Sequence, residues 1–405
     1  MSQRALSGIR VVDFCWVGAG SFTTKLLADQ GADVIKIESR AKVDGIRLSP
    51  PFAGGERGVN RSGYFADRNT SKRSCTLNMK SEEGQRIARD LIAHSDVVAN
   101  NFTPGVMERF GLSWQEVQRL NPSIVYLAMS MQGSEGPQRD YLGYGLTISA
   151  LVGLHSMTAL PGRPPVGTGT NYPDHIPNPC HGAFAVLAAL RHARRTGEGQ
   201  YIDMAQTEAT IATLGPAMLE YSVNGRNCGP IGNRHERYAP HGVYPCHGKD
   251  RWIAIAVTTE TQFEALVAEL DLPTGVVSPD LDERARRGAV ERLDQLIVER
   301  TRAEDHVQLA ERLQRAGVPA GPVHDAAGVV DRDPQLAARG HWVRLHHAEM
   351  GETLYSAPPF RFSRMPAKPA RPAPLLGEHT EEVCRDVLGM STAAIQSLVD
   401  KGILA

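Results

Sequence analysis

A strand, a glycine turn, a helix and a second strand follow one another between residues 9 and 38. Residues 9–14, IRVVDF, form a short apolar run typical of a buried strand, and residues 33–38, DVIKIE, form another. Between them the turn at residues 18–20, GAG, leads into a helix that we expect to end near residue 31. A βαβ unit of about 30 residues has this order, with parallel strands and a right-handed crossover. The pattern predicts an α/β protein with a doubly wound, Rossmann-like sheet.

The same alternation of helices and strands continues along the first half of the chain. We expect helices at residues 81–95 and 114–120, and strands at 97–100, 124–129 and 201–204. Residues 224–245 are rich in Gly, Pro, Asn and His, which is typical of a linker or long loop. We therefore predict three parts: a large Rossmann-like domain (1–225), a smaller α/β domain (226–330), and a linker with C-terminal helices returning to the large domain (331–405).

Composition excludes several functional classes. The 405-residue chain carries 44 basic and 45 acidic residues, a net charge of −1, so no overall field favours nucleic acid or an anionic membrane. The N-terminal segment MSQRALSGIRVVDF contains no uninterrupted apolar run of signal-peptide length, and no run is long enough to span a membrane. Six scattered cysteines without a C-x-x-C pair indicate reduced thiols. We expect a cytoplasmic protein without a bound metal.

Residues 171–208 place one acidic residue, Asp174, in a proline-rich loop before an apolar helix. Because prolines fix φ and lack an amide hydrogen, we expect Asp174 on a stiff, non-helical turn and the helix to begin near Gly182. A carboxylate on a rigid loop at a helix entrance suits nucleophilic or acid–base chemistry. The competing interpretation is that Asp174 merely caps the helix. The residues alone leave both interpretations open.

The turn at residues 18–20 supports a second hypothesis. It resembles part of a dinucleotide-binding fingerprint, with Glu38 about twenty residues on as the ribose ligand. The third glycine position of that fingerprint is occupied by Thr23, so the match is incomplete. A nicotinamide-dependent oxidoreductase is therefore one alternative, and a plain strand–helix connection is another.

Three strings resemble the class III CoA-transferase family. They are Asp174 with a following helix that ends AALRHARRTGEGQ, the string KRSCTLNMK at residues 72–80, and the string NFTPGVMER at residues 101–109. The resemblance implies that Asp174 is the nucleophile that becomes acylated. It implies that CoA is bound by Val17, Gly18, Ala19, Arg40, Leu77, Lys80, Asn101, Phe102 and Arg109.

Tyr144 and Gly145 fall where racemases of the same superfamily carry a histidine and an acid. We expect both residues in the substrate pocket. Racemisation needs an acid–base group on each face of the α-carbon, and tyrosine, with a pKa of ~10, is a poor base at neutral pH. A transferase is therefore favoured over an acyl-CoA racemase or isomerase, which stays the first alternative.

The loop around Asp174 looks most like that of the benzylsuccinate CoA-transferases. This likeness implies that CoA moves from an acyl-CoA, with succinyl-CoA as the expected donor, to a carboxylic acid such as benzylsuccinate or a similar bulky dicarboxylate. The CoA thioester is then a substrate, and we expect no tightly bound cofactor. The family forms interlocked dimers, so the resemblance also implies a homodimer or a heteromer with a related sister subunit.

Overall fold

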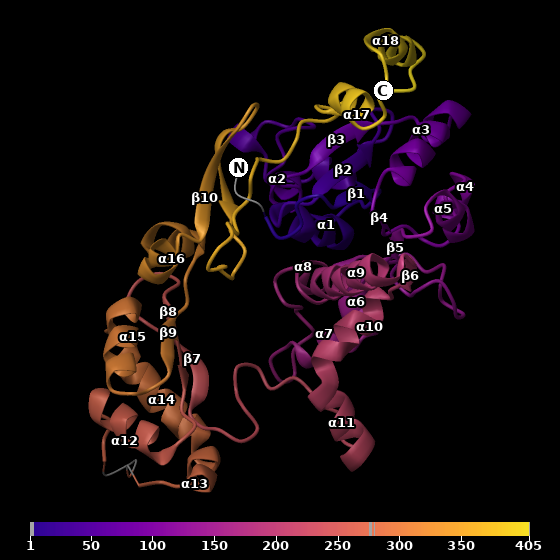
Figure 1. Ribbon diagram of the computed structural model, residues 1–405. Coiled ribbons are helices and arrows are strands. Elements are labelled where there is room, and N and C mark those ends of the chain that lie inside the picture. The colour runs from indigo at the N-terminus through magenta and orange to yellow at the C-terminus, as the bar shows by residue number, and fades with distance from the viewer. Residues whose placement is uncertain (1–3, 275–277, 279, 405) are drawn as a thin grey trace. The chain divides into compact units, whose positions relative to one another are not determined.

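The computed structural model describes residues 4–274, 278 and 280–404 (Figure 1). The chain divides into two units. The first unit consists of the segments up to His155, Gly167–Asn227, and from Gln335 onward. The second consists of Ser156–Val166 and Cys228–Pro334. The second unit thus includes Ser156–Val166, a segment that the sequence did not separate from its neighbours.

The first unit is built on a six-stranded sheet of parallel strands in the order β3-β2-β1-β4-β5-β6. The strands are β1 (Arg10–Asp13), β2 (Asp33–Glu38), β3 (Arg73–Thr76), β4 (Val97–Asn100), β5 (Val125–Ala128) and β6 (Gln200–Asp203). The strand order reverses between β1 and β4, and open α/β sheets bind ligands beyond the carboxyl ends of the strands at such a switch point. The predicted doubly wound α/β fold is confirmed.

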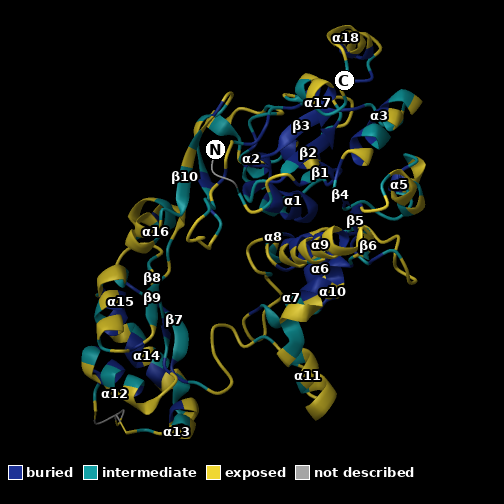
Figure 2. Cartoon of the chain, in the orientation of Figure 1, coloured by how far each residue is buried: buried dark blue, intermediate teal, exposed yellow. Residues whose placement is uncertain are grey.

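Helices cover both faces of this sheet. Val11 and Val12 of β1 are both fully buried but belong to different hydrophobic cores, because successive side chains of a strand point to opposite faces. The core around Val11 is completed by α1 (Ala19–Asp29) and α9 (Pro177–Thr196). The core around Val12 is completed by α3 (Glu82–Ala93), α5 (Trp114–Leu120), α17 (Thr380–Asp386) and α18 (Thr392–Asp400). Figure 2 shows strands β1 to β4, between these layers, in the dark blue of buried residues.

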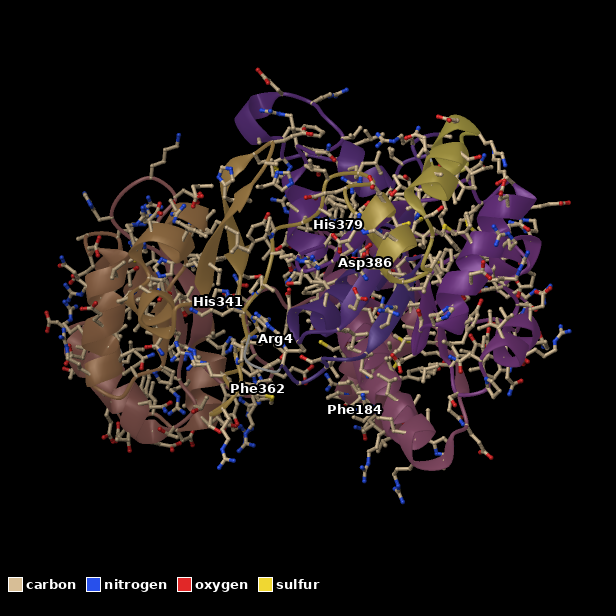
Figure 3. The ribbon with its side chains drawn as sticks, turned by 45° about the horizontal axis from the view of Figure 1, so that its top comes forward. Arg4, Phe184, His341, Phe362, His379 and Asp386 are labelled. Atoms are coloured by element: carbon tan, nitrogen blue, oxygen red, sulfur yellow. The ribbon has the colours of Figure 1, made fainter. Side chains whose placement is uncertain are left out.

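The C-terminal segment packs beside β3. The backbone N–H of Thr76 donates to the Thr380 hydroxyl at 2.9 Å, and the N–H of His379 donates to the Ser74 carbonyl at 2.9 Å. Figure 3 labels His379 and Asp386 on this part of the chain. An antiparallel hairpin of β10 (Trp342–His347) and β11 (Gly351–Ser356) precedes these helices. The sequence analysis did not predict this hairpin.

The second unit has its own three-stranded antiparallel sheet and its own core. The strands, in spatial order, are β7 (His241–Pro245), β8 (Trp252–Ala256) and β9 (Ala320–Pro322). The helices are α12 (Glu260–Glu269), α13 (Glu283–Gly288), α14 (Val290–Thr301) and α15 (His306–Arg315). β7 lies inside the segment that we predicted as a loop, so that prediction was wrong at its end. Pro245 ends an edge strand, a position that proline tolerates.

Two predictions around Asp174 were also wrong. Asp174 lies in a single helical turn, α8 (Tyr172–His175), rather than in a non-helical one, and α9 begins at Pro177 rather than near Gly182. Both helices carry proline in the first turn, where the missing amide hydrogen has no helical partner to lose. Proline at these positions starts a helix instead of excluding one. The predicted end of α9 is confirmed, because Gly197 caps it with φ of 78°.

The remaining helices are short and belong to the connections. They are α2 (Gly63–Arg68), α4 (Val106–Arg109), α6 (Gly145–Leu151), α7 (Leu154–Met157), α10 (Gln206–Ile211), α11 (Gly215–Asn224) and α16 (Pro334–Arg339).

Candidate active site

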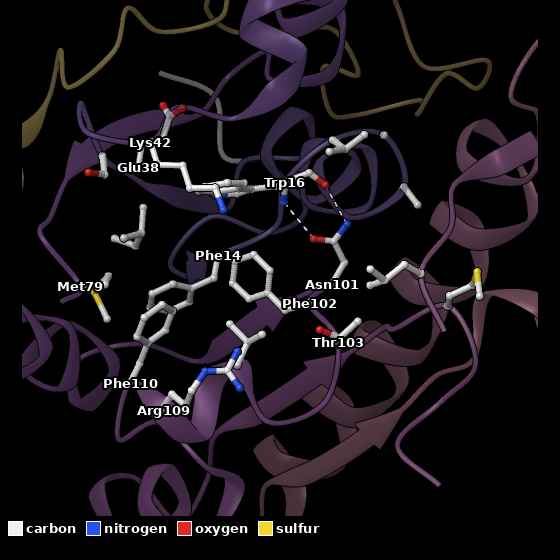
Figure 4. A pocket seen from close by; sticks show the side chains of 18 of the residues that line it. Phe14, Trp16, Glu38, Lys42, Met79, Asn101, Phe102, Thr103, Arg109 and Phe110 are labelled. Atoms are coloured by element: carbon white, nitrogen blue, oxygen red, sulfur yellow. Dashed lines mark hydrogen bonds between the residues drawn. The ribbon is translucent and has the colours of Figure 1, made fainter. Parts of the chain in front are cut away.

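A cavity of about 600 Å³ opens beyond the carboxyl ends of the strands of the first unit. The segments that follow β1, β2, β3 and β4 all contribute to its wall (Figure 4). Asp174 lies in this wall together with most of the residues expected to contact CoA. Those residues are Val17, Gly18, Ala19, Leu77, Lys80, Asn101, Phe102 and Arg109, and Tyr144, expected in the substrate pocket, lines the same cavity.

Asp174 is buried, with a relative exposure of 4%, and its carboxylate is held by a backbone amide. The N–H of Gly145, the first residue of α6, donates to Asp174 Oδ2 at 3.1 Å. Gly145 therefore contributes through its backbone and is not part of the cavity wall itself. The Asp174 side chain accepts no hydrogen bond from the first turn of α8 or α9. Among the described residues, its carboxylate accepts one hydrogen bond, from Gly145 in α6.

Two glycines give the Asp174 side chain its space. A Cβ atom on Gly18 would lie 3.0 Å from Asp174 Cβ and 3.3 Å from its Oδ2. A Cβ atom on Gly145 would lie 3.0 Å from the same Oδ2 and 2.7 Å from Asn171 Cβ. The 2.7 Å separation is one that real Cβ atoms essentially never show, and the separations of 3.0 and 3.3 Å are tighter than most. A larger residue at either position would therefore displace the carboxylate or its neighbours.

Burial raises the pKa of Asp174 to about 6. The hydrogen bond from Gly145 and the positive charge of Arg68 act in the opposite direction and favour the carboxylate. A buried carboxyl with a pKa near 6 is ionised in most molecules at pH 7 without a partner base. The group is therefore available as a nucleophile at neutral pH.

The loop before α1 is strained and firmly anchored. Val17 has φ of +61°, a conformation that is uncommon for a β-branched residue. Its N–H donates to Asp44 Oδ1 at 3.0 Å, and the other oxygen of Asp44 lies 3.0 Å from Lys36 Nζ. Asp44 and Lys36 are fully buried. This buried ion pair holds the backbone next to Gly18, and so next to Asp174.

Asn101 anchors the same loop from β4. Its Oδ1 accepts from the N–H of Trp16 at 2.9 Å and its Nδ2 donates to the carbonyl of Trp16 at 2.7 Å, as the dashed lines of Figure 4 show. Both ends of its amide are thus used within the protein. The resemblance implied a contact of Asn101 with CoA, whereas its hydrogen bonds position Trp16 in the cavity wall.

The outer part of the cavity combines cations with aromatic rings. Lys80 and Arg109 are exposed and line it, while Phe102 packs edge-to-face on Trp16 with ring centroids 5.9 Å apart. Arg40 is exposed and is not part of the wall. Lys42 occupies that place instead, with its Nζ 5.5 Å from the Trp16 ring.

Sequence reasoning missed several residues of this wall. Phe14, Trp16 and Phe110 all line it (Figure 4). Phe14 and Trp16 follow β1 directly, so their place after a strand at the switch point was the available signal.

Other basic residues near this sheet are used internally. The Arg47 guanidinium binds Glu38 with two hydrogen bonds of 2.8 and 2.7 Å, and both side chains are fully buried. Lys72 is buried against Asp13 at 2.9 Å. Because Arg47 already occupies both oxygens of Glu38, this carboxylate cannot hold a ribose, which removes the main support for a nicotinamide cofactor.

Within the part of the chain that the structure describes, no helix is long and apolar enough to cross a membrane. No group of three or more His, Cys, Asp or Glu side chains in those residues could hold a metal ion.

Comparisons with known proteins show the family of this chain. The sequence profile of CoA-transferase family III matches residues 6–380. The chain is 33% identical over 406 residues to the beta subunit of succinyl-CoA–L-malate CoA-transferase from Chloroflexus aurantiacus, covering 98% of each chain. It is 34% identical over 388 residues to succinate–glutarate CoA-transferase from Agrobacterium fabrum, covering 94% of this chain and 95% of that one.

A solved structure shows the same fold. The crystal structure of a CaiB/BaiF family protein from Brucella suis superposes with a TM-score of 0.85 at 31% identity, covering 95% of this chain and all of that one. With the family profile and relatives above 30% identity spanning nearly the whole chain, the conclusion is direct: the chain belongs to CoA-transferase family III.

Proposed function

We propose that the protein transfers CoA from succinyl-CoA to a dicarboxylic acid, with Asp174 as the covalent nucleophile. The observation that carries this proposal is the Asp174 carboxylate, buried between two glycines in the wall of a cavity with a cationic outer part. Relatives spanning nearly the whole chain are named for succinyl-CoA or succinate together with malate, citramalate or glutarate, which are all dicarboxylic acids.

The reaction proceeds by four exchanges at acyl carbons. An Asp174 oxygen attacks the succinyl thioester and expels CoA thiolate, which forms a mixed anhydride. The thiolate then attacks the Asp174 carbonyl and expels succinate, leaving an aspartyl-CoA thioester. The acceptor carboxylate attacks this thioester and expels the thiolate again. The thiolate finally attacks the acceptor acyl carbon, which releases the new acyl-CoA and regenerates the Asp174 carboxylate.

Backbone amides at the amino end of α1 are placed to stabilise the oxyanions of these steps. Gly18 and Ala19 begin this helix and line the cavity, and among the described residues no side chain caps it. Helix amino ends present unpaired N–H groups and favour negative charge. Gly18 also lies against Asp174, where each tetrahedral intermediate forms.

The outer part of the cavity is suited to the nucleotide of CoA. Lys42, Lys80 and Arg109 supply positive charge for its phosphates. Trp16 and Phe102 supply aromatic faces on which an adenine can stack. Val17, Leu77 and Phe102 line the cavity, and we propose that they contact the bound CoA, as expected from the sequence.

The lining beside Asp174 supports an acceptor with an apolar part. Tyr144, Leu142 and Met131 line the same cavity as Asp174. A bulky dicarboxylate such as benzylsuccinate is therefore one candidate acceptor, beside the smaller acids of the named relatives.

We further propose that the active form is a dimer or a complex with a sister chain. Large apolar side chains are exposed on α6, α9 and α11, including Leu146, Phe184 and Val223. Relatives named as alpha and beta subunits of one CoA-transferase support the heteromeric form.

Transfer is tested by incubating the protein with succinyl-CoA and a panel of dicarboxylic acids, with new acyl-CoA measured by mass spectrometry. We expect a new acyl-CoA with at least one acid. Hydroxylamine added after succinyl-CoA should form a hydroxamate on Asp174. Asp174→Ala should lose both signals and still bind CoA, whereas transfer above about a thousandth of the wild-type rate would contradict the assignment of the nucleophile.

A further inference from the structure

A second group of polar side chains surrounds Asp174 outside the residues that line the CoA cavity. It consists of Tyr64 and Arg68 from α2, and Asn171 and His175 beside Asp174 itself. A Cβ atom on Gly18 would lie 3.3 Å from both the Tyr64 hydroxyl and Asp174 Oδ2. The Tyr64 hydroxyl also lies 3.5 Å from His175 Nε2. Tyr64 and Asp174 thus lie on the two sides of the space next to Gly18.

Arg68 belongs to this group because its side chain packs beside Tyr64. Tyr64 and Arg68 are four positions apart on α2, so their side chains share one face of the helix. The Arg68 guanidinium lies 5.7 Å from the centre of the Tyr64 ring and 4.4 Å from the centre of the Phe22 ring. Its positive charge acts on Asp174. Arg68 is thus a cation held near the acyl-transfer centre.

The guanidinium keeps unused hydrogen-bonding capacity. One terminal nitrogen pairs with Asp67, which is itself partly exposed. The Nε atom is buried, and no described residue accepts a hydrogen bond from it. The side chain of Arg68 is only 11% exposed, so its remaining donors face a partly desolvated space where binding a carboxylate is strong.

The chemistry of the reaction needs a cation in such a place. A succinyl group bound at Asp174 carries a second carboxylate about 4 Å from its reacting carbon, by ordinary bond lengths. The cations of the cavity are Lys42, Lys80 and Arg109, which serve the nucleotide in the proposed function. A free carboxylate beyond Asp174 would otherwise lie unpaired in a region shielded from water, which is costly.

We infer that Arg68 binds the distal carboxylate of the acyl group and so selects dicarboxylic over monocarboxylic acids. This inference rests on the proposed function, since it assigns the substrate class of the same site. The rings of Phe22 and Tyr64 pack around the guanidinium, and the partly exposed Asp67 pairs with one of its terminal nitrogens.

The test uses isotope exchange, which requires no knowledge of the natural acceptor. Labelled succinate is exchanged into succinyl-CoA, and labelled butyrate, its monocarboxylic counterpart of equal chain length, into butyryl-CoA. We expect the wild type to favour the succinate pair. Arg68→Gln should lower kcat/KM for succinate exchange about 10- to 100-fold, because a charge-assisted hydrogen bond is lost. The same variant should change kcat/KM for butyrate exchange less than about threefold.

Control variants separate binding from other roles of Arg68. Arg68→Lys keeps the charge and should retain part of the preference for succinate. Arg86→Gln, which removes an exposed arginine paired with Asp90 on α3, should change neither exchange. In the wild type, unlabelled succinate should inhibit the exchange of labelled succinate more strongly than unlabelled butyrate does. This measurement needs no Arg68 variant, so it remains valid if such a variant fails to fold.

Three results would overturn the inference. The first is an equal loss of kcat/KM for both acids in Arg68→Gln, which would mean that Arg68 acts only on the charge of Asp174. The second is no loss of kcat/KM for succinate exchange in that variant. The third is no preference for succinate over butyrate in the wild type. Absence of exchange with every acid would instead contradict the proposed transferase reaction itself.

Discussion

At the scale of single residues, Asp174 combines two opposing requirements. As the proposed nucleophile it must be ionised to attack a thioester, yet burial raises its pKa to about 6. The rate should therefore fall as the pH drops through about 6, because the protonated carboxyl is not nucleophilic. We expect the profile of kcat/KM against pH to show one acid-side ionisation near that value. A profile flat down to pH 4.5 would contradict the role of Asp174.

The same pKa predicts a trend in stability. The folded state holds the Asp174 proton more tightly than the unfolded chain, whose carboxyl has its ordinary value of 3.8. Between these values the folded state binds more protons, so this group's contribution to stability decreases as the pH rises from about 4 to about 6. Asp174→Asn removes the charge and keeps an acceptor for Gly145. It should unfold at higher temperature than the wild type at pH 7, and the difference should vanish below pH 4.

Asp44 and Lys36 test how the strained loop is held. Asp44→Asn leaves a buried ammonium without its carboxylate, and we expect a loss of about 3–5 kcal/mol in the free energy of unfolding. Lys36→Met alone leaves the buried Asp44 carboxylate without its ammonium partner, and should lower the free energy of unfolding by a similar amount. The double variant Asp44→Asn with Lys36→Met should lose much less than the sum, as measured by urea unfolding. Additive losses would show that the pair does not act as a unit.

At the scale of elements, the close approach of α1 to α8 determines the geometry of the site. Gly18→Ala places a Cβ atom 3.0 Å from Asp174 Cβ, although its φ of −76° suits any residue. We expect kcat to fall about 10- to 100-fold from the displaced carboxylate, with the fold retained. Gly45→Ala is the matched control, because nothing lies within 4 Å of its added Cβ. Equal kcat in the two variants would argue against this packing constraint.

The elements also show what the sequence could and could not predict. Most strands of the large sheet were predictable because buried parallel strands form short apolar runs, as in residues 9–14. Strand β3 was not predicted, because its sequence RSCT is polar although all four residues are buried. The turn of α8 was not, since proline in a first helical turn and proline in a loop look alike. The hairpin of β10 and β11 was missed because its strands, WVRLHH and GETLYS, mix polar and apolar residues without clear alternation.

Within the site, the sequence predicted residues better than roles. Asp174, Lys80 and Arg109 line one cavity, as expected from three distant strings. The amide of Asn101 makes hydrogen bonds to Trp16 at both its oxygen and its nitrogen, and Lys42 lines the cavity where Arg40 was expected. Which side chain of a loop faces a cavity depends on backbone direction, which residue spacing alone does not determine outside regular helices and strands.

At the scale of the whole molecule, helix α11 is difficult to explain in an isolated chain. None of its residues is buried, and Leu219, Tyr221 and Val223 expose 63%, 59% and 75% of their surface (Figure 2). A helix with several exposed large apolar side chains normally packs against another chain. The dimer or heteromer proposed above supplies such a partner. We therefore expect α11 to lie in a subunit interface.

Light scattering after size-exclusion chromatography measures this directly. We expect the wild type at twice the 44.0 kDa chain mass, or larger with a sister chain. Leu219→Glu combined with Val223→Glu should shift it toward 44.0 kDa, because charges buried in an interface are costly without partners. Leu120→Glu, at an exposed leucine on α5, should leave the mass unchanged. A wild type that runs as a single chain at working concentration would leave α11 exposed in the active protein and contradict the assembly proposed here.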